Sequence, residues 1–379
     1  MIYMNVDTFF SQLLKNGVTF FTGVPDSLLN VFCDEIVNRY GIGNKHHIVA
    51  HNEGGSVALA SGYHLATGKV PCVYMQNSGI GNALNPVASL THPNVYGIPM
   101  LFVVGWRGEP GVADEPQHIF QGEVTLKLLS DMDIECFIVD KNTSAGQTED
   151  ALLRFNELFA ENKSAAFVIR KGAFSGNNHI YENDYTLNRE QAVSIVLEAT
   201  EIDTVVSTTG KISRELFEIR QKRAEGHARD FLTVGSMGHS VMIALGIALH
   251  QPKRRVWCLD GDGAILMHTG GMGIVGSEAP ERFIHVVFNN SAHETVGGVP
   301  TVAGTVDLSS IALACGYRHV HKAYDGQSLK MILKKAKIQN GPVFVEIFVA
   351  LDSRSDLGRP TISTHENKRS FMDFLSKGG

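Results

Sequence analysis

The sequence predicts an α/β protein built from two doubly wound parallel-sheet domains. Short runs of β-branched residues alternate with helical patterns along the chain, which is typical of parallel sheets covered by helices on both faces. The alternation is interrupted once, by a polar stretch over residues 172–188, and then starts again. A chain of 379 residues is long enough for two full hydrophobic cores. We therefore expect two domains, covering residues 1–178 and 179–379.

In the first domain, predicted strands and helices follow each other in turn. The predicted strands cover residues 46–51, 70–75, 100–106, 135–140 and 165–172. The clearest helical patterns cover residues 26–41 and 53–68, and the second ends in a glycine typical of a C-terminal cap. This order predicts parallel strands joined by helical crossovers.

The same order returns in the second domain, which we expect to open with a helix over residues 189–200. Its predicted strands cover residues 203–210, 255–263, 283–290 and 341–349. A further helix is predicted over residues 308–316. The two domains are therefore expected to be of similar size and architecture.

The composition is that of an ordinary globular protein, with 44% hydrophobic and 19% charged residues. Its net charge of −6 favours neither nucleic acid nor an anionic membrane as a partner. The five cysteines are scattered without a C-x-x-C pair, which fits a reducing compartment. The start of the chain lacks the pattern of a signal peptide, and no apolar run is long enough to span a membrane. We expect a cytoplasmic protein.

Three loops of the second domain directly follow predicted strands: residues 207–213, 259–265 and 288–298. In open parallel sheets, ligands collect at the carboxyl ends of the strands. Asp262 lies between two glycines in the second loop, and Asn290 completes an Asn pair in the third. Their oxygens suit Mg²⁺, which takes few protein ligands and adds phosphate and water. The alternative is an ordinary β-turn at Gly-Asp-Gly and a helix cap at Asn-Asn.

Gly-Asp-Gly, then residues 264–288, then Asn-Asn together resemble the signature of the thiamine-diphosphate enzymes. The resemblance implies two cofactors, thiamine diphosphate and Mg²⁺. It implies that Asp262, the Asn290 side chain and the Ala292 carbonyl bind the metal. The residues expected close to the diphosphate are Gly210, Lys211, Gly261, Gly263 and Ala264.

Two segments elsewhere fit the same resemblance. Glu53 follows a predicted strand in the string IVAHNEGGS, where this family has a glutamate that hydrogen-bonds the pyrimidine ring of the cofactor. Residues 233–249 resemble the segment in which Met237 would bend the cofactor and the Gly235 carbonyl would accept from its amino group. Outside the family, Glu53 is a first-turn acid favoured by the helix dipole, and Met237 is a core residue.

The resemblance also gives each domain a role. Residues 1–178 would bind the pyrimidine, and residues 179–379 would bind the diphosphate and the metal. The chain has no room for the middle domain of larger family members. The resemblance further implies a homo-oligomer, a dimer or larger, whose active site lies between chains.

Seven further strings resemble the branch of this family that decarboxylates 2-oxo acids carrying a phosphonate or a sulfonate. They cover residues 22–29, 76–86, 105–111, 114–118, 208–216, 289–298 and 356–361. The expected reaction is decarboxylation of 3-phosphonopyruvate to phosphonoacetaldehyde and CO₂, in the biosynthesis of phosphonates such as 2-aminoethylphosphonate. Decarboxylation of sulfopyruvate is the alternative. A nicotinamide dehydrogenase is rejected because the nearest glycine-rich string, residues 270–276, does not follow a strand.

A dianionic substrate calls for cations, and Arg107 and Lys211 both lie on glycine-rich loops at predicted strand ends. Asp26 and Ser27, in the string GVPDS, complete the candidate substrate-binding residues. The alternatives are an ion pair between Arg107 and Glu109, a solvated Lys211, and a helix cap at Asp26.

Catalysis also requires proton donors. His118 and His293 are candidates because histidine titrates near neutrality, and Asp26 and Glu53 are the candidate catalytic carboxylates. The tail over residues 351–375 follows the last strand. It either closes over the active site or forms a terminal helix packed on a neighbouring element.

Overall fold

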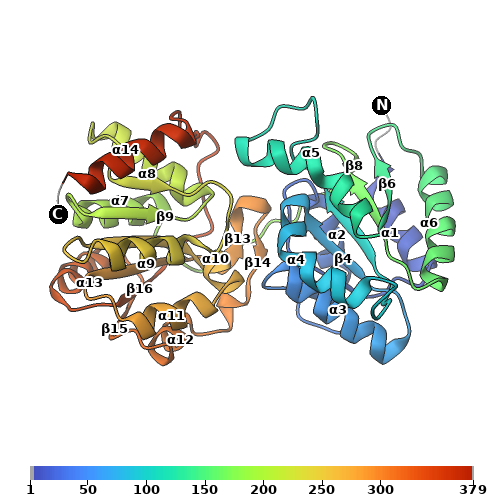
Figure 1. The fold of residues 1–379 in the computed structure, drawn as a ribbon, viewed down its shortest axis with the longest axis horizontal. Coiled ribbons are helices and arrows are strands. Elements are labelled where there is room, and N and C mark those ends of the chain that lie inside the picture. The colour runs from blue at the N-terminus through green and yellow to red at the C-terminus, as the bar shows by residue number, and fades with distance from the viewer. Residues whose placement is uncertain (1–3, 378–379) are drawn as a thin grey trace. The chain divides into compact units, whose positions relative to one another are not determined.

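The computed structural model describes residues 4–377, and the chain divides into two compact units, Met1–Ile180 and Tyr181–Gly379 (Figure 1). Each unit contains one six-stranded sheet. All strand pairings within these two sheets are parallel, and helices connect the strands. The predicted fold class, two parallel-sheet α/β domains, is confirmed.

The sheet of the first unit has the strand order β3-β2-β4-β5-β7-β6. Its strands are β2 (Phe21–Gly23), β3 (His47–Val49), β4 (Cys72–Gln76), β5 (Leu101–Gly105), β6 (Glu135–Val139) and β7 (Ala165–Ile169). The helices of this unit are α1 (Val6–Lys15), α2 (Asn30–Tyr40), α3 (Glu53–Thr67), α4 (Ile80–Pro86), α5 (Pro116–Asp131) and α6 (Ala145–Ala160). A small second sheet pairs β1 (Met4–Asn5) with β8 (Phe174–Ser175). Strand β8 lies within the stretch predicted as a linker.

Both faces of this first sheet are buried. On β7, Phe167 packs against Phe9 of α1, with the ring centroids 5.0 Å apart, and Phe9 also contacts Phe32 of α2. The neighbouring residues Ala166 and Val168 belong to a separate apolar cluster. Because successive side chains of a strand point to opposite faces, a strand buried on both faces reads as a continuous apolar run.

The sheet of the second unit has the strand order β10-β9-β11-β12-β16-β15. Its strands are β9 (Thr204–Ser207), β10 (Asp230–Leu232), β11 (Val256–Gly261), β12 (Phe283–Asn289), β15 (His319–Ala323) and β16 (Val343–Phe348). Its helices are α7 (Arg189–Thr200), α8 (Lys211–Lys222), α9 (Ser240–His250), α10 (Asp262–Met267), α11 (Gly270–Glu278), α12 (Leu308–Ala314), α13 (Gly326–Ile338) and α14 (Thr364–Ser376). A short antiparallel pair, β13 (Ala292–His293) and β14 (Val299–Pro300), lies in the loop after β12.

Alternation along β11 again divides the core into two clusters. Trp257 and Leu259 belong to one cluster, and Val256 and Cys258 belong to the other. All four side chains are fully buried. This sheet is therefore covered by apolar residues on both faces. Polar residues that bind a ligand are then expected at the ends of its strands.

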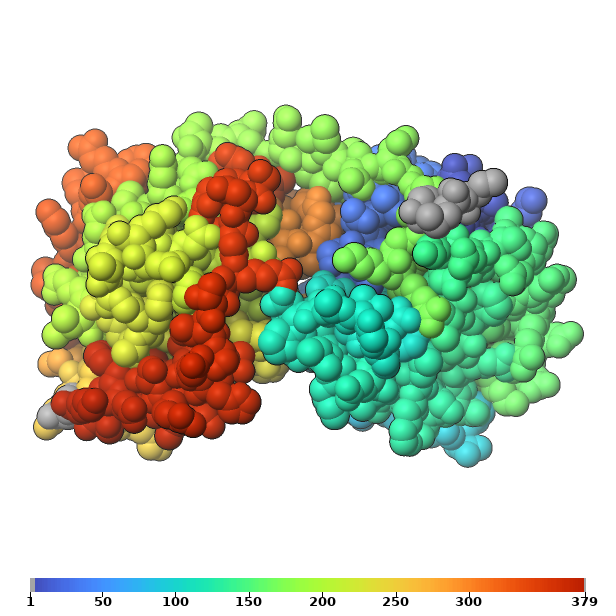
Figure 2. Space-filling model, turned by 90° about the horizontal axis from the view of Figure 1, so that it is seen from above, coloured from blue at the N-terminus to red at the C-terminus, as the bar shows by residue number. Residues whose placement is uncertain are grey.

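Helix α14 covers one edge of the second sheet. Asn367 of α14 donates from Nδ2 to the Asp230 carbonyl (2.8 Å) and accepts from the Leu232 N–H at 3.1 Å, both on β10. The ring of Phe371 packs against that of Phe231, with centroids 5.5 Å apart. Figure 2 shows this C-terminal segment as a continuous red band over the second unit. The second part of the tail forms the packed helix α14, and its first part contacts the candidate residue Lys211 through Ser353.

Some local predictions were wrong. The helix expected over residues 26–41 begins at Asn30, because residues 26–29 form turns that carry a buried Asp26. Strands β2, β10 and β15 were not predicted. The first two are only three residues long, too short for a clear alternation, and β15 is a half-buried edge strand rich in His and Lys.

Within residues 4–377, no helix combines the length and the apolar character that a membrane span requires.

Candidate active-site residues in each unit

Four neighbouring strands of the first unit end at the same edge of its sheet, and a polar candidate follows each of them. Glu53 follows β3, Asp26 follows β2, Asn77 follows β4 and Arg107 follows β5. Carboxyl ends of parallel strands form the usual ligand-binding edge of an open α/β sheet. The predicted residues Glu53, Asp26 and Arg107 therefore lie along one edge.

Glu53 begins helix α3 and is buried, with 5% of its surface exposed. The Asn52 side chain caps this helix by accepting from the Gly55 N–H at 2.7 Å. Asn82 donates from Nδ2 to Glu53 Oε2 at 2.9 Å, which leaves Oε1 available for another donor. A Cβ added at Gly79 would overlap with the Glu53 side chain, so Gly79 provides the space that this carboxylate occupies.

Asp26 is fully buried, and the Leu28 N–H donates to its Oδ2 at 3.2 Å. Among the residues that the structure describes, its Oδ1 has no hydrogen-bond partner. Burial raises the pKa of Asp26 to about 6, and the nearby Arg107 charge lowers it by less. A Cβ at Gly105 would collide with this carboxylate. Asp26 is therefore a group that can change protonation near neutral pH.

Arg107 is held from three sides. Its Nε and Nη2 donate to the two oxygens of Asp114, at 2.7 and 2.5 Å, and its Nη1 donates to Ser27 Oγ at 3.1 Å. The Asn77 side chain bonds the Arg107 backbone at both N–H (3.1 Å) and carbonyl (2.8 Å). The alternative ion pair with Glu109 is not formed, because Glu109 pairs with Arg170 at 2.7 Å.

His118 lies in the first turn of α5, close to the Arg107 and Asp114 pair. Burial lowers the pKa of His118, and the positive charge of Arg107 lowers it further. The structure thus brings Asp26, Ser27 and Arg107 together, with His118 within electrostatic reach of Arg107.

In the second unit, the predicted residues again follow four adjacent strands. Lys211 follows β9, Met237 follows β10, Asp262 follows β11 and Asn290 follows β12. Gly210 adopts a positive φ of 98°, a conformation that favours glycine, and Lys211 begins helix α8 directly after it. Gly261 ends β11 and precedes α10, which starts at Asp262.

Asp262 is 3% exposed, and Thr301 donates to its Oδ2 at 2.6 Å. Its other hydrogen-bond donors are backbone N–H groups, including that of Ala292. Burial raises the pKa of Asp262 to about 7. A buried carboxylate surrounded by neutral donors lacks a balancing positive charge, which a bound cation would supply.

The two asparagines after β12 have different partners. Asn289 donates from Nδ2 to Glu346 Oε1 of β16 at 2.8 Å and accepts from the Ser291 N–H at 2.9 Å, so it fixes the loop to the sheet. Asn290 accepts at Oδ1 from the Ala292 N–H (3.1 Å), the same group that interacts with Asp262. The Asn pair is followed by strand β13, so it does not cap an α-helix. The alternative of a simple helix cap is therefore wrong.

Gly263 lies against Met237 and His293. A Cβ at Gly263 would be 2.9 Å from His293 Nδ1 and 3.4 Å from Met237 Cε. Burial lowers the pKa of His293 to about 4, so its imidazole is neutral at pH 7. Gly235 has a φ of 68°, and its N–H donates to Thr209 Oγ1 at 3.2 Å.

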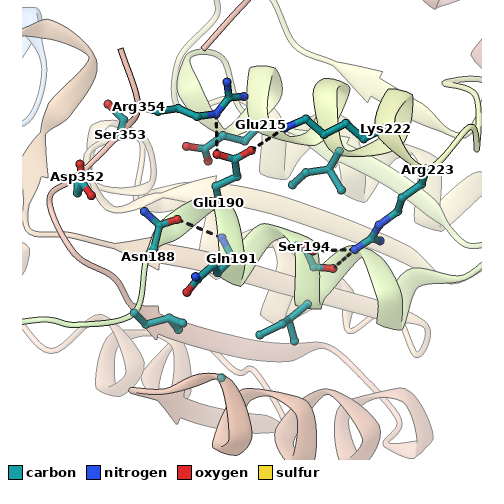
Figure 3. Close-up of a pocket in the computed structure, with 14 residues that line it drawn as sticks. Asn188, Glu190, Gln191, Ser194, Glu215, Lys222, Arg223, Asp352, Ser353 and Arg354 are labelled. Carbon is teal, nitrogen blue, oxygen red and sulfur yellow. Dashed lines mark hydrogen bonds and ion pairs between the residues drawn. The ribbon is translucent and has the colours of Figure 1, made fainter. Parts of the chain in front are cut away.

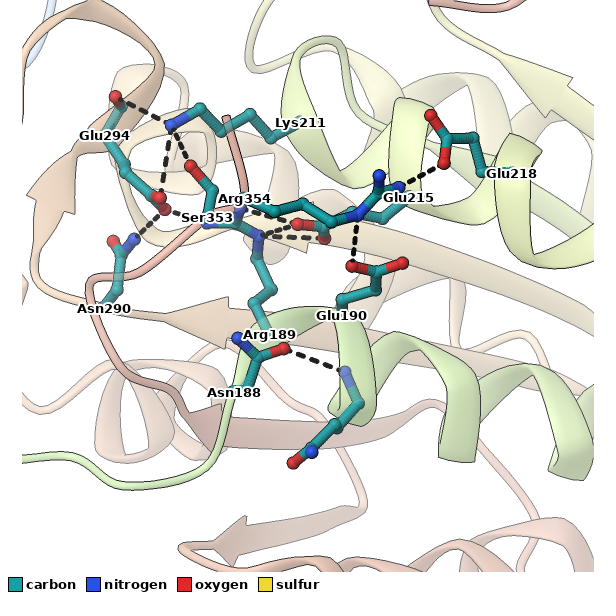
Figure 4. Close-up of polar contacts among 11 residues, drawn as sticks. Asn188, Arg189, Glu190, Lys211, Glu215, Glu218, Asn290, Glu294, Ser353 and Arg354 are labelled. Atoms are coloured by element: carbon teal, nitrogen blue, oxygen red, sulfur yellow. Dashed lines mark hydrogen bonds and ion pairs between the residues drawn. The ribbon is translucent and has the colours of Figure 1, made fainter. Parts of the chain in front are cut away.

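Lys211 is not a solvated loop charge, because its side chain is 23% exposed and fully hydrogen-bonded. Its Nζ donates to Ser353 Oγ at 2.6 Å, to Glu294 Oε1 at 3.2 Å and to the Glu294 carbonyl at 3.4 Å (Figure 4). Burial, followed by the charge of Arg189, lowers the pKa of Lys211 to about 8. Since an ammonium group has three donors, a phosphate could bind Lys211 only by replacing one of these partners.

Asp262 and Asn290 both interact with the Ala292 N–H, and their side-chain oxygens are hard donors of the kind that suits Mg²⁺. The neutral surroundings of Asp262 fit the same ion. Sequence reasoning missed the residues that hold these candidates in place, namely Asn77, Gly79, Asn82, Asp114, Arg189, Glu294, Thr301 and Glu346. Several of them lie inside the strings that carry the family resemblance, but nothing in the sequence shows which side chain they touch.

A separate cavity of about 870 Å³ lies beside α7 and α8 in the second unit (Figure 3). It is lined in part by Glu190, Glu215 and residues 352–354, and neither Asp262 nor Asn290 lines it. Arg354 at its rim already pairs with Glu190 at 2.8 Å and with Glu218. The cavity is thus distinct from the candidate metal ligands.

Comparison with known families agrees with this geometry. Residues 4–129 match the model of the thiamine pyrophosphate enzyme N-terminal TPP binding domain, and residues 208–347 match that of the C-terminal TPP binding domain. The chain therefore belongs to the thiamine pyrophosphate enzymes, and both of its units are of the cofactor-binding type.

Curated relatives define the branch of this family. Phosphonopyruvate decarboxylase of Streptomyces viridochromogenes is 34% identical over 378 residues, covering 95% of this chain and 92% of the relative. Phosphonopyruvate decarboxylase of Streptomyces hygroscopicus is 33% identical, over 95% and 91%. Sulfopyruvate decarboxylase of Methanosarcina acetivorans is 25% identical, over 86% and 88%. Similarity of this extent places the chain with the phosphonopyruvate decarboxylases.

Proposed function

We propose that this protein decarboxylates 3-phosphonopyruvate to phosphonoacetaldehyde and CO₂, with thiamine diphosphate and Mg²⁺ as cofactors, in the biosynthesis of phosphonates such as 2-aminoethylphosphonate. The observation that carries the proposal is the similarity to phosphonopyruvate decarboxylases along nearly the whole chain. Sulfopyruvate is the second candidate substrate, because a full-length sulfopyruvate decarboxylase is also similar, at lower identity.

The residues proposed to hold the cofactors are those at the strand ends. Asp262, Asn290 and the Ala292 carbonyl would bind Mg²⁺, as their oxygen donors support. The proposed diphosphate contacts are Gly210, Lys211, Gly261, Gly263 and Ala264. When bound, thiamine diphosphate supplies the electron sink that decarboxylation of a 2-oxo acid requires.

Glu53, Gly235 and Met237 are proposed to act on the pyrimidine part of the cofactor. The buried Glu53 carboxylate, oriented by Asn82, keeps one oxygen for a ring nitrogen. Met237 and His293 both lie against Gly263, so these residues would form one wall of the reacting region.

Arg107, Ser27, Asp26 and Lys211 are proposed to bind the substrate. The guanidinium of Arg107 is fixed by Asp114 and faces Ser27, which gives an anionic group two adjacent donors. Asp26 can hold a proton near neutral pH and could deliver it during turnover. His118 and His293 are proposed as further proton donors. Because the pKa of each is lowered, the resting imidazole is neutral and has to take up a proton before it can donate one.

We also propose a homo-oligomer, a dimer or larger, whose active sites are shared between chains. The support is a pair of apolar helices at the surface of the second unit. Met242 and Leu249 of α9 are 39% and 43% exposed, and Ile274 of α11 is 49% exposed. A helix that is apolar on all sides is normally buried, so a second copy is the simplest cover for this face.

The five free cysteines support a cytoplasmic location.

The test is aldehyde release from phosphonopyruvate, sulfopyruvate and pyruvate, each with and without thiamine diphosphate and Mg²⁺. We expect strong preference for phosphonopyruvate and dependence on both cofactors, with activity lost in Glu53→Ala. Preference for sulfopyruvate would keep the chemistry and change the substrate. Turnover without thiamine diphosphate would overturn the proposal.

A further inference from the structure

Glu294 is a largely buried carboxylate that pairs with two cations beside the candidate metal ligand Asn290. Its side chain is 10% exposed. Arg189 donates from Nη1 to Glu294 Oε2, and Lys211 Nζ lies 3.2 Å from Oε1 (Figure 4). Such a pairing satisfies a charge that would otherwise be costly to bury.

Arg189 is in turn held in place by Glu215. Arg189 also donates to Glu215, with Nη2 2.7 Å from Oε1 and Nε 3.0 Å from Oε2. The side chains of Arg189 and Glu215 are 5% and 2% exposed. Two cations and two carboxylates therefore form a closed, nearly neutral group, and Glu294 has little freedom to move within it.

Glu294 determines which way the Asn290 amide faces. Asn290 Nδ2 donates to Glu294 Oε2 at 2.9 Å. An ionised carboxylate can only accept hydrogen bonds, so it must face the nitrogen of the amide rather than the oxygen. The oxygen, Asn290 Oδ1, then points to the Ala292 N–H, which also interacts with Asp262.

We propose that Glu294 is a positioning residue that holds Asn290 Oδ1 toward the divalent cation and thereby sets the affinity of the site for the metal. The inference rests on the proposed role of Asn290 as a metal ligand. Outer-sphere residues of this kind typically change metal affinity by about 10- to 100-fold when they are removed.

The experiment measures Mn²⁺ binding by electron paramagnetic resonance, in the presence of thiamine diphosphate and without substrate. We expect Glu294→Ala to weaken Mn²⁺ binding by about 10- to 100-fold. Glu294→Gln keeps the shape and an acceptor oxygen, so it should recover part of the loss. Glu218→Ala is the matched control, because Glu218 also pairs with an arginine, Arg354, but does not touch Asn290. It should bind Mn²⁺ like the parent.

A double-mutant cycle with Asn290→Ala tests the positioning role of Glu294 separately from the role of Asn290 as a metal ligand. If Glu294 acts through Asn290, then Glu294→Ala has little further effect on Mn²⁺ affinity in the Asn290→Ala background. Full additivity of the two changes, or unaltered binding in Glu294→Ala, would overturn the inference. Unaltered binding in Asn290→Ala would instead overturn the proposed metal ligand. Thermal unfolding of each apo variant shows whether it is folded.

Discussion

Carboxylates at the strand ends are built into space that glycines leave free. Asp26 lies where a Cβ at Gly105 would be, and Glu53 lies where a Cβ at Gly79 would be. Neither glycine has a positive φ, so what these positions require is the absence of a side chain and not an unusual backbone. Each glycine therefore acts as a steric partner of one acid.

The burial of Asp26 predicts a pH-dependent stability. Because burial raises its folded-state pKa from 3.8 to about 6, its contribution to stability is fully present below about pH 4 and is lost as the pH rises through about 6. Above that range, the ionised carboxylate costs about 3 kcal/mol. We expect Asp26→Asn to exceed the parent in free energy of unfolding by about this amount at pH 8, and by little at pH 4. Urea denaturation at both pH values measures the difference, and an equal difference at both would contradict the prediction.

The space at Gly79 predicts a loss of activity from a single methyl group. Gly79→Ala should displace the Glu53 carboxylate, and a misplacement of about 1 Å can cost about 100-fold in kcat. Gly81→Ala is the control, because a Cβ there meets no atom within 4 Å. It lies in helix α4, where alanine should raise stability by about 1 kcal/mol. Steady-state kinetics gives kcat for both variants. Similar kcat values for Gly79→Ala and Gly81→Ala would contradict the prediction.

Individual site residues were predictable where a short motif fixes both the residue and its place. Asp262 and Asn290 directly follow strands β11 and β12, and Glu53 begins the helix that follows β3. The partner of Arg107 was not predictable, since Glu109 and Asp114 both lie nearby in sequence and only the loop geometry selects Asp114. A side chain's contact depends on backbone turns that composition does not encode.

At the level of elements, the long strands that are buried on both faces were predicted, and so were the three-residue β3 and the half-buried β6, whereas β2, β10 and β15 were not. Strands β4, β5, β7, β11, β12 and β16 are five to seven residues long, and most of their residues are apolar. Strand β10 has three residues and depends on helix α14, which lies far away in the sequence, for its hydrogen bonds at the sheet edge. Such long-range support leaves no local pattern to detect.

The contact between α14 and β10 predicts a stability effect. Asn367→Ala should lower the free energy of unfolding by about 1–3 kcal/mol, because it leaves the Leu232 N–H and the Asp230 carbonyl buried without a partner. Lys368→Ala, at the exposed next position of the same helix, is the control and should change stability by less than about 0.5 kcal/mol. Urea denaturation of both variants measures this, and equal effects would argue against the contact.

For the whole molecule, the proposed sharing of active sites between chains predicts complementation. Glu53→Ala and Asp262→Asn should each be inactive alone. If one site takes Glu53 from one chain and Asp262 from its partner, a hybrid dimer has one intact site, and random mixing recovers about a quarter of the parent activity. The measurement is activity after the two variants are unfolded and refolded together. Absence of recovery in mixed, dimeric protein would show that each site is built from one chain.

The position of β16 has a consequence for how the chain is synthesised. Strand β16 lies between β12 and β15 in the sheet, yet among residues 4–377 it is the last of the strands to be synthesised. Until it emerges, β12 has an open edge and Asn289 has no Glu346 to bond. Elongation at about 5–20 residues per second gives the first unit seconds to fold before the second can close. A premature stop shortly before Val343 would therefore leave the first unit able to fold and the loop of Asn290 without its anchor.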